Sequence, residues 1–172
     1  PALLCGYKLI KLAIDILRQM AQILSYLHSH APVIIHRDIK PANTMFVMDK
    51  KKDKGKVVLI DFGAARTFKV EDEEYTKIYT EGYAPPEQIA GYPLPASDIY
   101  ALGVTMITLL CSTRNISKIP FSQSTGRYYW HDRSVPISSD MRDLIDAMTD
   151  PNIKQRIQSG LELAHRLHSL IA

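Results

Sequence analysis

The order of apolar and polar positions predicts a mostly helical chain. Residues 8–29 carry apolar side chains at intervals of three and four, which is the spacing of an amphipathic helix. That pattern ends at Pro32, because proline cannot continue a helix. The run 97–112 is apolar on nearly every side, which predicts a helix buried at the centre of the domain. Residues 139–149 and 160–171 predict two further amphipathic helices.

Three short apolar runs predict strands instead of helices. They occupy residues 33–35, 44–48 and 56–60. The second and third runs flank a turn-rich segment, so we expect them to pair as a hairpin. The fold class that follows is mainly α with a small β-hairpin region, and a polar loop lies at the base of the hairpin.

Composition narrows the class of protein without deciding its function. The 172 residues suffice for one domain, and 46% hydrophobic with 23% charged residues is ordinary for a soluble globular protein. The net charge is only +3. The Lys-rich segment 49–55 is interrupted by Asp and has no interleaved aromatic residue, which favours a solvated loop over a nucleic-acid contact. No apolar run reaches roughly 18 residues, so no membrane segment is expected.

The two cysteines indicate a reducing compartment. Cys5 and Cys111 have no metal-like spacing and make no disulfide framework, so we expect a cytoplasmic protein. The chain begins at Pro1 without an initiator Met, which fits either a fragment or a processed terminus.

A polar loop separates the first two predicted strands. Five polar or charged side chains fall within eight positions there, and such a group is costly to place in a core. One explanation is that the Asp and Asn residues of this region simply favour turns. The other is that the loop carries chemistry. The five residues are His36, Arg37, Asp38, Lys40 and Asn43.

A further carboxylate follows the second strand of the hairpin. Asp61 stands 18 residues beyond Asn43, and Gly63 is expected to let the chain turn sharply there. Hairpin pairing would bring Asn43 and Asp61 together as oxygen ligands for Mg²⁺, with phosphate oxygens completing the shell. Asp38 remains to orient a hydroxyl and take its proton, and Lys40 remains as a point charge for a phosphoryl group. This set suits phosphoryl transfer, in which catalysis is mainly positioning and charge neutralisation.

Four motifs in order resemble those of eukaryotic-type (Hanks-type) protein kinases. "HRDIKPAN" at 36–43 and "DFG" at 61–63 resemble the catalytic loop and the metal-binding turn. "YTEGYAPPEQ" at 79–88 is similar to the end of the activation segment, and "SDIYALG" at 97–103 to the start of the large central helix. The ordered pattern extends over roughly residues 8–170. The residues of several motifs resemble those of bacterial, in particular cyanobacterial, members of this family.

The resemblance implies roles for individual residues. Asp38 would be the catalytic base and Lys40 the cation at the transition state, while Asn43 and Asp61 would bind the Mg²⁺ of ATP. Lys40, two positions after Asp38, is typical of family members that phosphorylate Ser or Thr. Thr80 would bond toward Asp38 and Lys40, beside the hydroxyl of the protein substrate.

Other matching residues would have structural roles. His36 is expected to be a buried histidine that packs and hydrogen-bonds rather than a catalytic acid. Asp98 is expected to accept backbone N–H groups of the catalytic loop. Glu87 and Arg156 match a buried ion pair of the family.

Regulation is a weaker implication of the resemblance. Arg37 is similar to the arginine that in many family members grips a phosphate on the activation segment. Thr76, four residues before Thr80, is the expected phosphorylation site. The acidic run 71–74 could instead supply part of that negative charge constitutively.

Two family features are absent from the sequence. No two glycines form a Gly-x-Gly loop, and no strand with a Val-Ala-x-Lys pattern precedes residue 33. The family places both in the N-terminal, ATP-binding lobe. We therefore expect residues 1–172 to form the C-terminal (large) lobe only, to need the missing N-terminal lobe as a partner, and to be inactive alone.

Three hypotheses for function remain open at this point. The first is a serine/threonine protein kinase that transfers the γ-phosphate of ATP to a protein hydroxyl, represented by its catalytic lobe. The second is a non-catalytic kinase-like protein-binding module, which the absent lobe favours and the intact polar set disfavours. The third is a small-molecule phosphotransferase of related fold. The segment 79–88 disfavours it, because in protein kinases this segment shapes a peptide-binding ledge.

Overall fold

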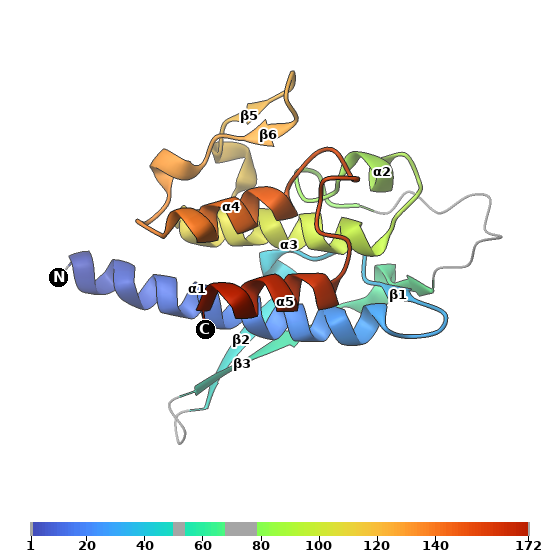
Figure 1. Cartoon of the computed structure of the whole chain (residues 1–172), viewed down its shortest axis with the longest axis horizontal. Coiled ribbons are helices and arrows are strands. Elements are labelled where there is room, and N and C mark those ends of the chain that lie inside the picture. The colour runs from blue at the N-terminus through green and yellow to red at the C-terminus, as the bar shows by residue number, and fades with distance from the viewer. Residues whose placement is uncertain (1, 50–53, 68–78, 172) are drawn as a thin grey trace.

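The structure is a computed structural model. The part of the chain that it describes contains five α-helices and three two-stranded sheets. The described residues are 2–49, 54–67 and 79–171. Figure 1 shows two helical layers. One contains α1 (Ala2–His28) and α5 (Gly160–Ile171), and α3 (Pro95–Leu110) and α4 (Ser139–Met148) form the other. All four helices were predicted, and a mainly α fold is confirmed.

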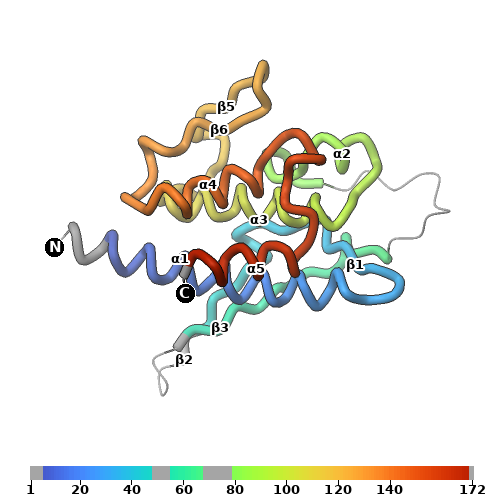
Figure 2. Tube along the Cα trace, viewed as in Figure 1, coloured from blue at the N-terminus to red at the C-terminus, as the bar shows by residue number. Residues whose placement is uncertain are grey.

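The layer of α1 and α5 is held together by close backbone contact. Figure 2 shows α5, in red, running along α1, in blue. A Cβ atom added at Gly160 would lie 2.1 Å from the backbone nitrogen of Ser25, so only glycine permits this approach. The inner face of α1 is fully buried at Leu17, Met20 and Leu24, as its apolar stripe predicts.

The α3 helix lies at the centre of the core. Every residue from position 96 to 108 is buried, which confirms the prediction from its uninterrupted apolar run. Pro95 occupies the first turn, where the missing N–H costs nothing, and the Ser97 hydroxyl accepts the N–H of Leu94 at 3.0 Å. At Gly103 an added Cβ would lie 2.6 Å from the Thr149 methyl group, so this glycine lets the end of α4 pack closely.

The predicted hairpin is present and docks against α1. Strands β2 (Thr44–Asp49) and β3 (Lys54–Leu59) pair antiparallel, and they project from the lower layer in Figure 1. Gln19 of α1 donates to the carbonyl of Gly55 at 3.1 Å and accepts the N–H of Val57 at 2.9 Å. These two bonds fix strand β3, and therefore the loops at the base of the hairpin, relative to the helical core.

Shorter elements surround these parts. Strand β1 (Ile34–Ile35) pairs with β4 (Arg66–Thr67), β5 (Phe121–Ser122) pairs with β6 (Arg127–Tyr128), and α2 (Pro86–Ile89) is a single turn. Of these, only β1 was predicted, from the apolar run 33–35. The others are two to four residues long and show no measurable periodicity.

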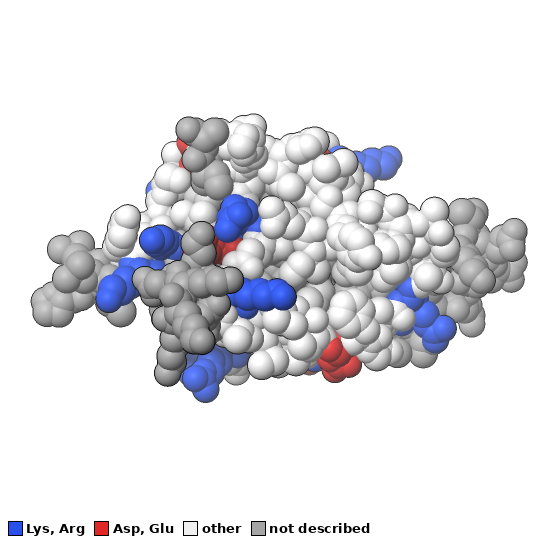
Figure 3. Space-filling view, turned by 90° about the horizontal axis from the view of Figure 1, so that it is seen from below, with Lys and Arg blue, Asp and Glu red and all other residues white. Residues whose placement is uncertain are grey.

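The described helices and the charge distribution bear on possible partners. None of the described helices is both long and apolar enough to cross a bilayer. On the face seen in Figure 3, Lys and Arg side chains stand as separate groups on a largely uncharged surface. The centre of the Lys-rich segment, residues 50–53, lies outside the described residues.

Candidate active site

The polar loop between β1 and β2 is held by one buried carboxylate. Asp98, at the start of α3, accepts the backbone N–H groups of His36 and Arg37, each at 2.8 Å. Arg37 has φ +65°, a left-handed conformation that costs a non-glycine residue about 1 kcal/mol or more. The two charge-assisted bonds offset that cost. The loop therefore keeps a conformation that it would not adopt by itself.

A histidine that sequence reasoning missed completes this anchor. His28, at the end of α1, places Nε2 3.2 Å from the Asp98 carboxylate, and its Nδ1 accepts the N–H of Gly160 at 3.1 Å. Because a backbone N–H can only donate, Nδ1 is the acceptor and Nε2 carries the proton that faces Asp98. One imidazole thus joins α1, α3 and α5 directly beneath the loop. A histidine at the end of an apolar stripe gives no sequence signal for this role.

Asp38 is the centre of the polar cluster above the anchor. Its Oδ1 accepts the Thr80 hydroxyl at 2.6 Å, and its Oδ2 lies 2.8 Å from Lys40 Nζ and 2.8 Å from Asn43 Nδ2. Lys40 Nζ also donates to the Thr80 hydroxyl at 2.9 Å, which closes a ring of three side chains. The sequence-predicted residues Asp38, Lys40, Asn43 and Thr80 are therefore in direct contact. We call these four residues the loop cluster.

The electrostatic setting keeps Asp38 ionised. Burial by itself raises the pKa of this carboxyl, but the hydrogen bond and positive charge of Lys40, with the bonds from Thr80 and Asn43, outweigh it. The net result is a pKa below the usual value for aspartate. A carboxylate of this kind stays ionised at neutral pH and can accept a hydrogen bond from a bound hydroxyl.

The hairpin brings Asn43 and Asp61 to the same end of the sheet. Asn43 ends a short 3-10 turn, and its carbonyl accepts the N–H of Ile60 at 2.9 Å, so Asp61 follows immediately. The Asn43 amide nitrogen is bonded to the backbone and side chain of Asp38 at 2.9 and 2.8 Å. The amide oxygen of Asn43 and the exposed carboxylate of Asp61 are the atoms that suit a hard cation.

The turn after β3 depends on Asp61 rather than on Gly63, which corrects the sequence analysis. Asp61 adopts the left-handed conformation with φ +62°, whereas Gly63 is not among the glycines with positive φ. Gly63 instead donates its N–H to Asp61 Oδ1 at 3.2 Å. Aspartate tolerates this conformation because its short side chain bonds locally. Among the described residues no group of three His, Cys, Asp or Glu side chains is arranged to hold a metal by itself.

His36 and Arg37 point away from the loop cluster into the protein. His36 is fully buried, its Nδ1 lies 3.4 Å from the N–H of Asp38, and its ring meets Phe62 edge-on at 4.8 Å. Arg37 is also buried, and its Nε donates to the carbonyl of Ala64 at 2.6 Å. Arg37 therefore contacts the segment that follows Asp61. Thr76 and the acidic run 71–74, both named in the sequence analysis, lie outside the described residues.

Gln88 of α2 is a second residue that sequence reasoning missed. It is buried, and its amide nitrogen donates to the carbonyl of Arg37 at 2.6 Å. Both backbone groups of Arg37 are thus bonded to side chains, one from α2 and one from α3. The only local signal was the position of Gln88, directly after the Pro-Pro-Glu sequence that ends at Glu87.

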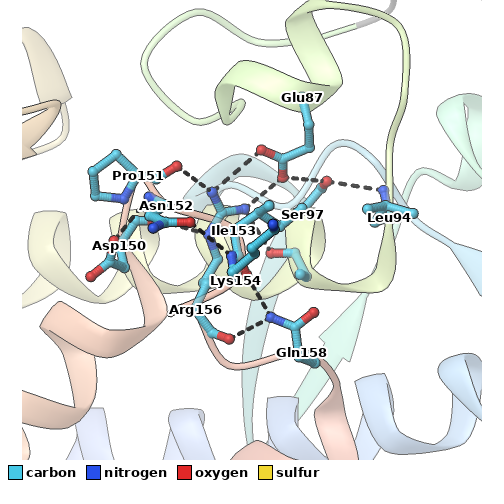
Figure 4. A network of polar contacts seen from close by, with 11 residues as sticks. Glu87, Leu94, Ser97, Asp150, Pro151, Asn152, Ile153, Lys154, Arg156 and Gln158 are labelled. Atoms are coloured by element: carbon cyan, nitrogen blue, oxygen red, sulfur yellow. Dashed lines mark hydrogen bonds and ion pairs between the residues drawn. The ribbon is translucent and has the colours of Figure 1, made fainter.

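Glu87 and Arg156 form an ion pair away from the loop cluster, and we call them the buried pair. Arg156 Nη1 lies 2.5 Å from Glu87 Oε1, and the Arg156 side chain has no exposed surface. Figure 4 shows how the two side chains face each other, with Ser97 and the segment 150–158 around them. Ser97 donates its hydroxyl to Glu87 at 2.8 Å, and Arg156 Nε donates to the carbonyl of Asp150 at 2.8 Å. This pair ties α2 to α3 and to the segment before α5.

Comparison with known proteins gives one consistent result. Residues 9–167 match the family model described as the protein kinase domain. The chain is 36% identical over 153 residues to serine/threonine-protein kinase F of Synechocystis sp. and covers 29% of that protein, with 86% of the chain aligned. It is 35% identical over 160 residues to serine/threonine-protein kinase PknA of Nostoc sp. and covers 27% of it, with 89% of the chain aligned. The chain thus spans less than a third of the length of these curated relatives.

Proposed function

Because the chain belongs to the protein kinase family, we propose that it supplies the catalytic loop for transfer of the γ-phosphate of ATP to a Ser or Thr hydroxyl of a protein. The observation that carries this proposal is the loop cluster. One ionised carboxylate, Asp38, is bonded at once to an ammonium, Lys40, and to a hydroxyl, Thr80. The names of the relatives support serine and threonine as acceptors.

Asp38 is the proposed base. Its carboxylate offers about four lone-pair sites, and the bonds from Thr80, Lys40 and Asn43 use three of them. The remaining site can accept the proton of an incoming hydroxyl while the other bonds hold the carboxylate in position. Fixing the base before the substrate binds lowers the entropic cost of reaching a reactive geometry.

Lys40 and Thr80 are proposed to place charge and substrate around that base. Lys40 Nζ is bonded to both the Asp38 carboxylate and the Thr80 hydroxyl, so its charge is held where a transferred phosphoryl group would pass. Thr80 belongs to the segment 79–85, and its bond to Asp38 fixes the distance between that segment and the base. We therefore infer that segment 79–85 binds the protein substrate.

The donor set at the base of the hairpin suits Mg²⁺ with bound ATP. Asn43 and Asp61 would hold the ion through an amide oxygen and a carboxylate, which are hard oxygen ligands. The ion, when bound, neutralises charge on the phosphates and orients them for in-line transfer. Among the described residues no three His, Cys, Asp or Glu side chains are grouped to hold a metal, which suits an ion that takes much of its shell from phosphate oxygens and water.

We further propose that the chain represents the C-terminal lobe and that the ATP-covering elements lie outside its 172 residues. No Gly-x-Gly pair occurs in the sequence. In addition, the outer face of the hairpin exposes apolar side chains, with Met45 paired opposite Val58 and Val47 beside them. An apolar face of this kind suits cover by another element.

One experiment tests function and lobe assignment together. The 172-residue chain is assayed alone and as a fusion protein behind a protein-kinase nucleotide-binding lobe, by Mg²⁺-dependent ATP titration and radiolabelled phosphate transfer. We expect transfer from the fusion protein only. Asp38→Asn should lower its turnover about 100- to 10,000-fold and leave ATP affinity nearly unchanged, because Asp38 faces the hydroxyl rather than the nucleotide.

A matched control and two opposing outcomes complete that experiment. Asp132→Asn removes an exposed carboxylate outside the loop cluster and should change neither quantity. Near-normal turnover in Asp38→Asn would refute the assignment of Asp38. Micromolar ATP binding with steady turnover by the isolated chain, both lost in Asp61→Asn, would refute the lobe assignment.

A further inference from the structure

The turn that presents Thr80 to the base is compact and depends on one glycine. The Thr80 carbonyl accepts the N–H groups of Tyr83 and Ala84 at 3.1 and 3.2 Å. Gly82, inside this turn, has φ +82°, a conformation that L-residues rarely adopt. The position of the Thr80 hydroxyl beside Asp38 therefore depends on how firmly the backbone at Gly82 is held.

A tyrosine from a distant hairpin holds that backbone. The hydroxyl of Tyr128, in β6, donates to the Gly82 carbonyl at 2.7 Å across 46 positions of sequence. On the other side, an added Cβ at Gly82 would lie 2.6 Å from Ile116 Cγ2, so Ile116 packs directly against the turn. Gly82 is thus fixed by a hydrogen bond and a packing contact, both from the segment between α3 and α4.

Tyr128 is itself supported from the core. Tyr100, on α3, is buried and neighbours the Tyr128 phenol. A tyrosine hydroxyl has one proton, and the Gly82 carbonyl can only accept, so Tyr128 donates to Gly82. Burial raises the pKa of Tyr128, which keeps that proton in place at neutral pH. The Arg156 guanidinium lies 4.9 Å above the Tyr100 ring.

We propose that Tyr128 is a positioning residue for the protein substrate: by holding the Gly82 carbonyl, it fixes the turn that carries Thr80 next to Asp38. This inference rests on the proposed function, since it names what prepares the same site. The bond does not touch Lys40, Asn43 or Asp61. Its loss should therefore weaken use of the protein substrate and leave the use of ATP nearly unchanged.

Amide hydrogen exchange on the 172-residue chain tests the structural half of the proposal. Tyr128→Phe keeps the ring and its contact with Phe121 at 4.8 Å but removes the donor. A neutral hydrogen bond of ordinary strength corresponds to about 3- to 10-fold, so the Tyr83 and Ala84 amides should exchange faster by that factor. Amides of α3 should not change.

The matched control is the neighbouring tyrosine. Tyr129 is 61% exposed, and its phenol makes no hydrogen bond within the described part of the chain, so Tyr129→Phe should leave all of these rates unchanged. Unchanged rates in Tyr128→Phe would overturn the proposal. Equal acceleration in α3 would also overturn it, because Tyr128 would then be a general core residue.

Steady-state kinetics on an active form, such as the fusion protein, test the functional half. In Tyr128→Phe the KM for the protein substrate should rise about 3- to 10-fold, while kcat and the KM for ATP stay within about twofold. An equal fall in kcat with unchanged substrate KM would overturn the positioning role. Absence of transfer in every variant, wild type included, would refute the proposed function instead, and the exchange rates would still decide whether Tyr128 holds the turn.

Discussion

The loop cluster and the buried pair are both built from opposite charges, yet they differ in how far the cation is removed from solvent. In the buried pair, all three guanidinium nitrogens of Arg156 have acceptors: two go to Glu87 and to backbone carbonyls, and Nε goes to Asp150. In the loop cluster, the Lys40 ammonium is bonded to Asp38 and Thr80, and the Lys40 side chain is 25% exposed. The cation that holds the fold is enclosed by acceptors, whereas the cation proposed to serve chemistry is partly open to solvent.

The backbone conformation around the two groups also differs. The loop cluster is flanked by Arg37 and Asp61, which both have positive φ. Glu87 and Arg156 do not. Backbone strain of this kind persists only where the surroundings impose it, as Asp98 does for Arg37. The strained region is also the one proposed to transfer phosphate.

The largest effect should separate activity from stability at Asp61. In the active fusion protein Asp61→Asn should lower phosphate transfer about a thousandfold, because the carboxylate that balances the metal charge is lost. Asparagine tolerates the left-handed conformation at φ +62°, so thermal melting should barely change. A large fall in melting temperature would mean that Asp61 is a structural residue, and normal transfer would mean that it binds no metal.

The opposite pattern is expected at the buried pair. Glu87→Ala leaves the buried Arg156 charge uncompensated and should cost about 3–5 kcal/mol in the free energy of unfolding, measured by urea denaturation. Glu162→Ala is the control, since Glu162 pairs with Arg166 on the surface of α5, where such pairs contribute about 0.3–0.5 kcal/mol. A loss at Glu87 no larger than at Glu162 would contradict a structural role for the pair.

A hydroxyl in the loop cluster, Thr80, and a hydroxyl bonded to the buried pair, Ser97, allow a test with effects of intermediate size. Ser97→Ala removes a bond to Glu87 and the acceptor for the Leu94 N–H, and should lower the free energy of unfolding by about 1–2 kcal/mol with normal transfer. Thr80→Val keeps the shape at the loop cluster and should lower transfer with little effect on unfolding. If both variants changed only the free energy of unfolding, or both changed only phosphate transfer, the proposed difference between the loop cluster and the buried pair would be wrong.

The smallest effect is a pH dependence that arises from Asp38. Its pKa is lower in the folded state than in the unfolded chain, so Asp38 stabilises the fold above its unfolded pKa, and this contribution is lost as pH falls through the folded value. The difference in unfolding free energy between wild type and Asp38→Asn should therefore be constant near neutrality and shrink below about pH 4. A difference that grew on acidification would contradict the assigned direction.

Long elements and ordered motifs were predictable from the sequence because both are local patterns. The apolar stripe of α1 and the uninterrupted run of α3 set those helices to within a few residues at most ends. The boundaries of the two hairpin strands were enough to predict that Asn43 lies near Asp61. The same reasoning assigned the turn to Gly63, because glycine is the usual residue in a sharp turn. Asp61 adopts the left-handed conformation instead, and its side chain accepts the N–H of Gly63.

The supporting contacts were not predictable, since they join distant positions. His28 meets Asp98 across 70 positions, Gln88 meets Arg37 across 51, and Tyr128 meets Gly82 across 46. Each is an ordinary polar residue in its local sequence, and only the tertiary packing reveals what it touches. Two-residue strands such as β6 escape prediction because they are too short to show a periodicity.

The imidazole beneath the loop also has a consequence for how the protein is made. His28 takes its bond from Gly160, which is 132 positions later in the chain. During synthesis on the ribosome, α1 emerges long before the first turn of α5 exists. Until Gly160 has been synthesised, Nδ1 of His28 has no Gly160 N–H to accept. The tautomer of the imidazole is then not fixed by that bond, and Nε2 need not carry the proton that faces Asp98. The proposed catalytic loop is therefore encoded early and completed late, so a nascent chain stalled before residue 160 carries every residue of the loop cluster on an unfinished support.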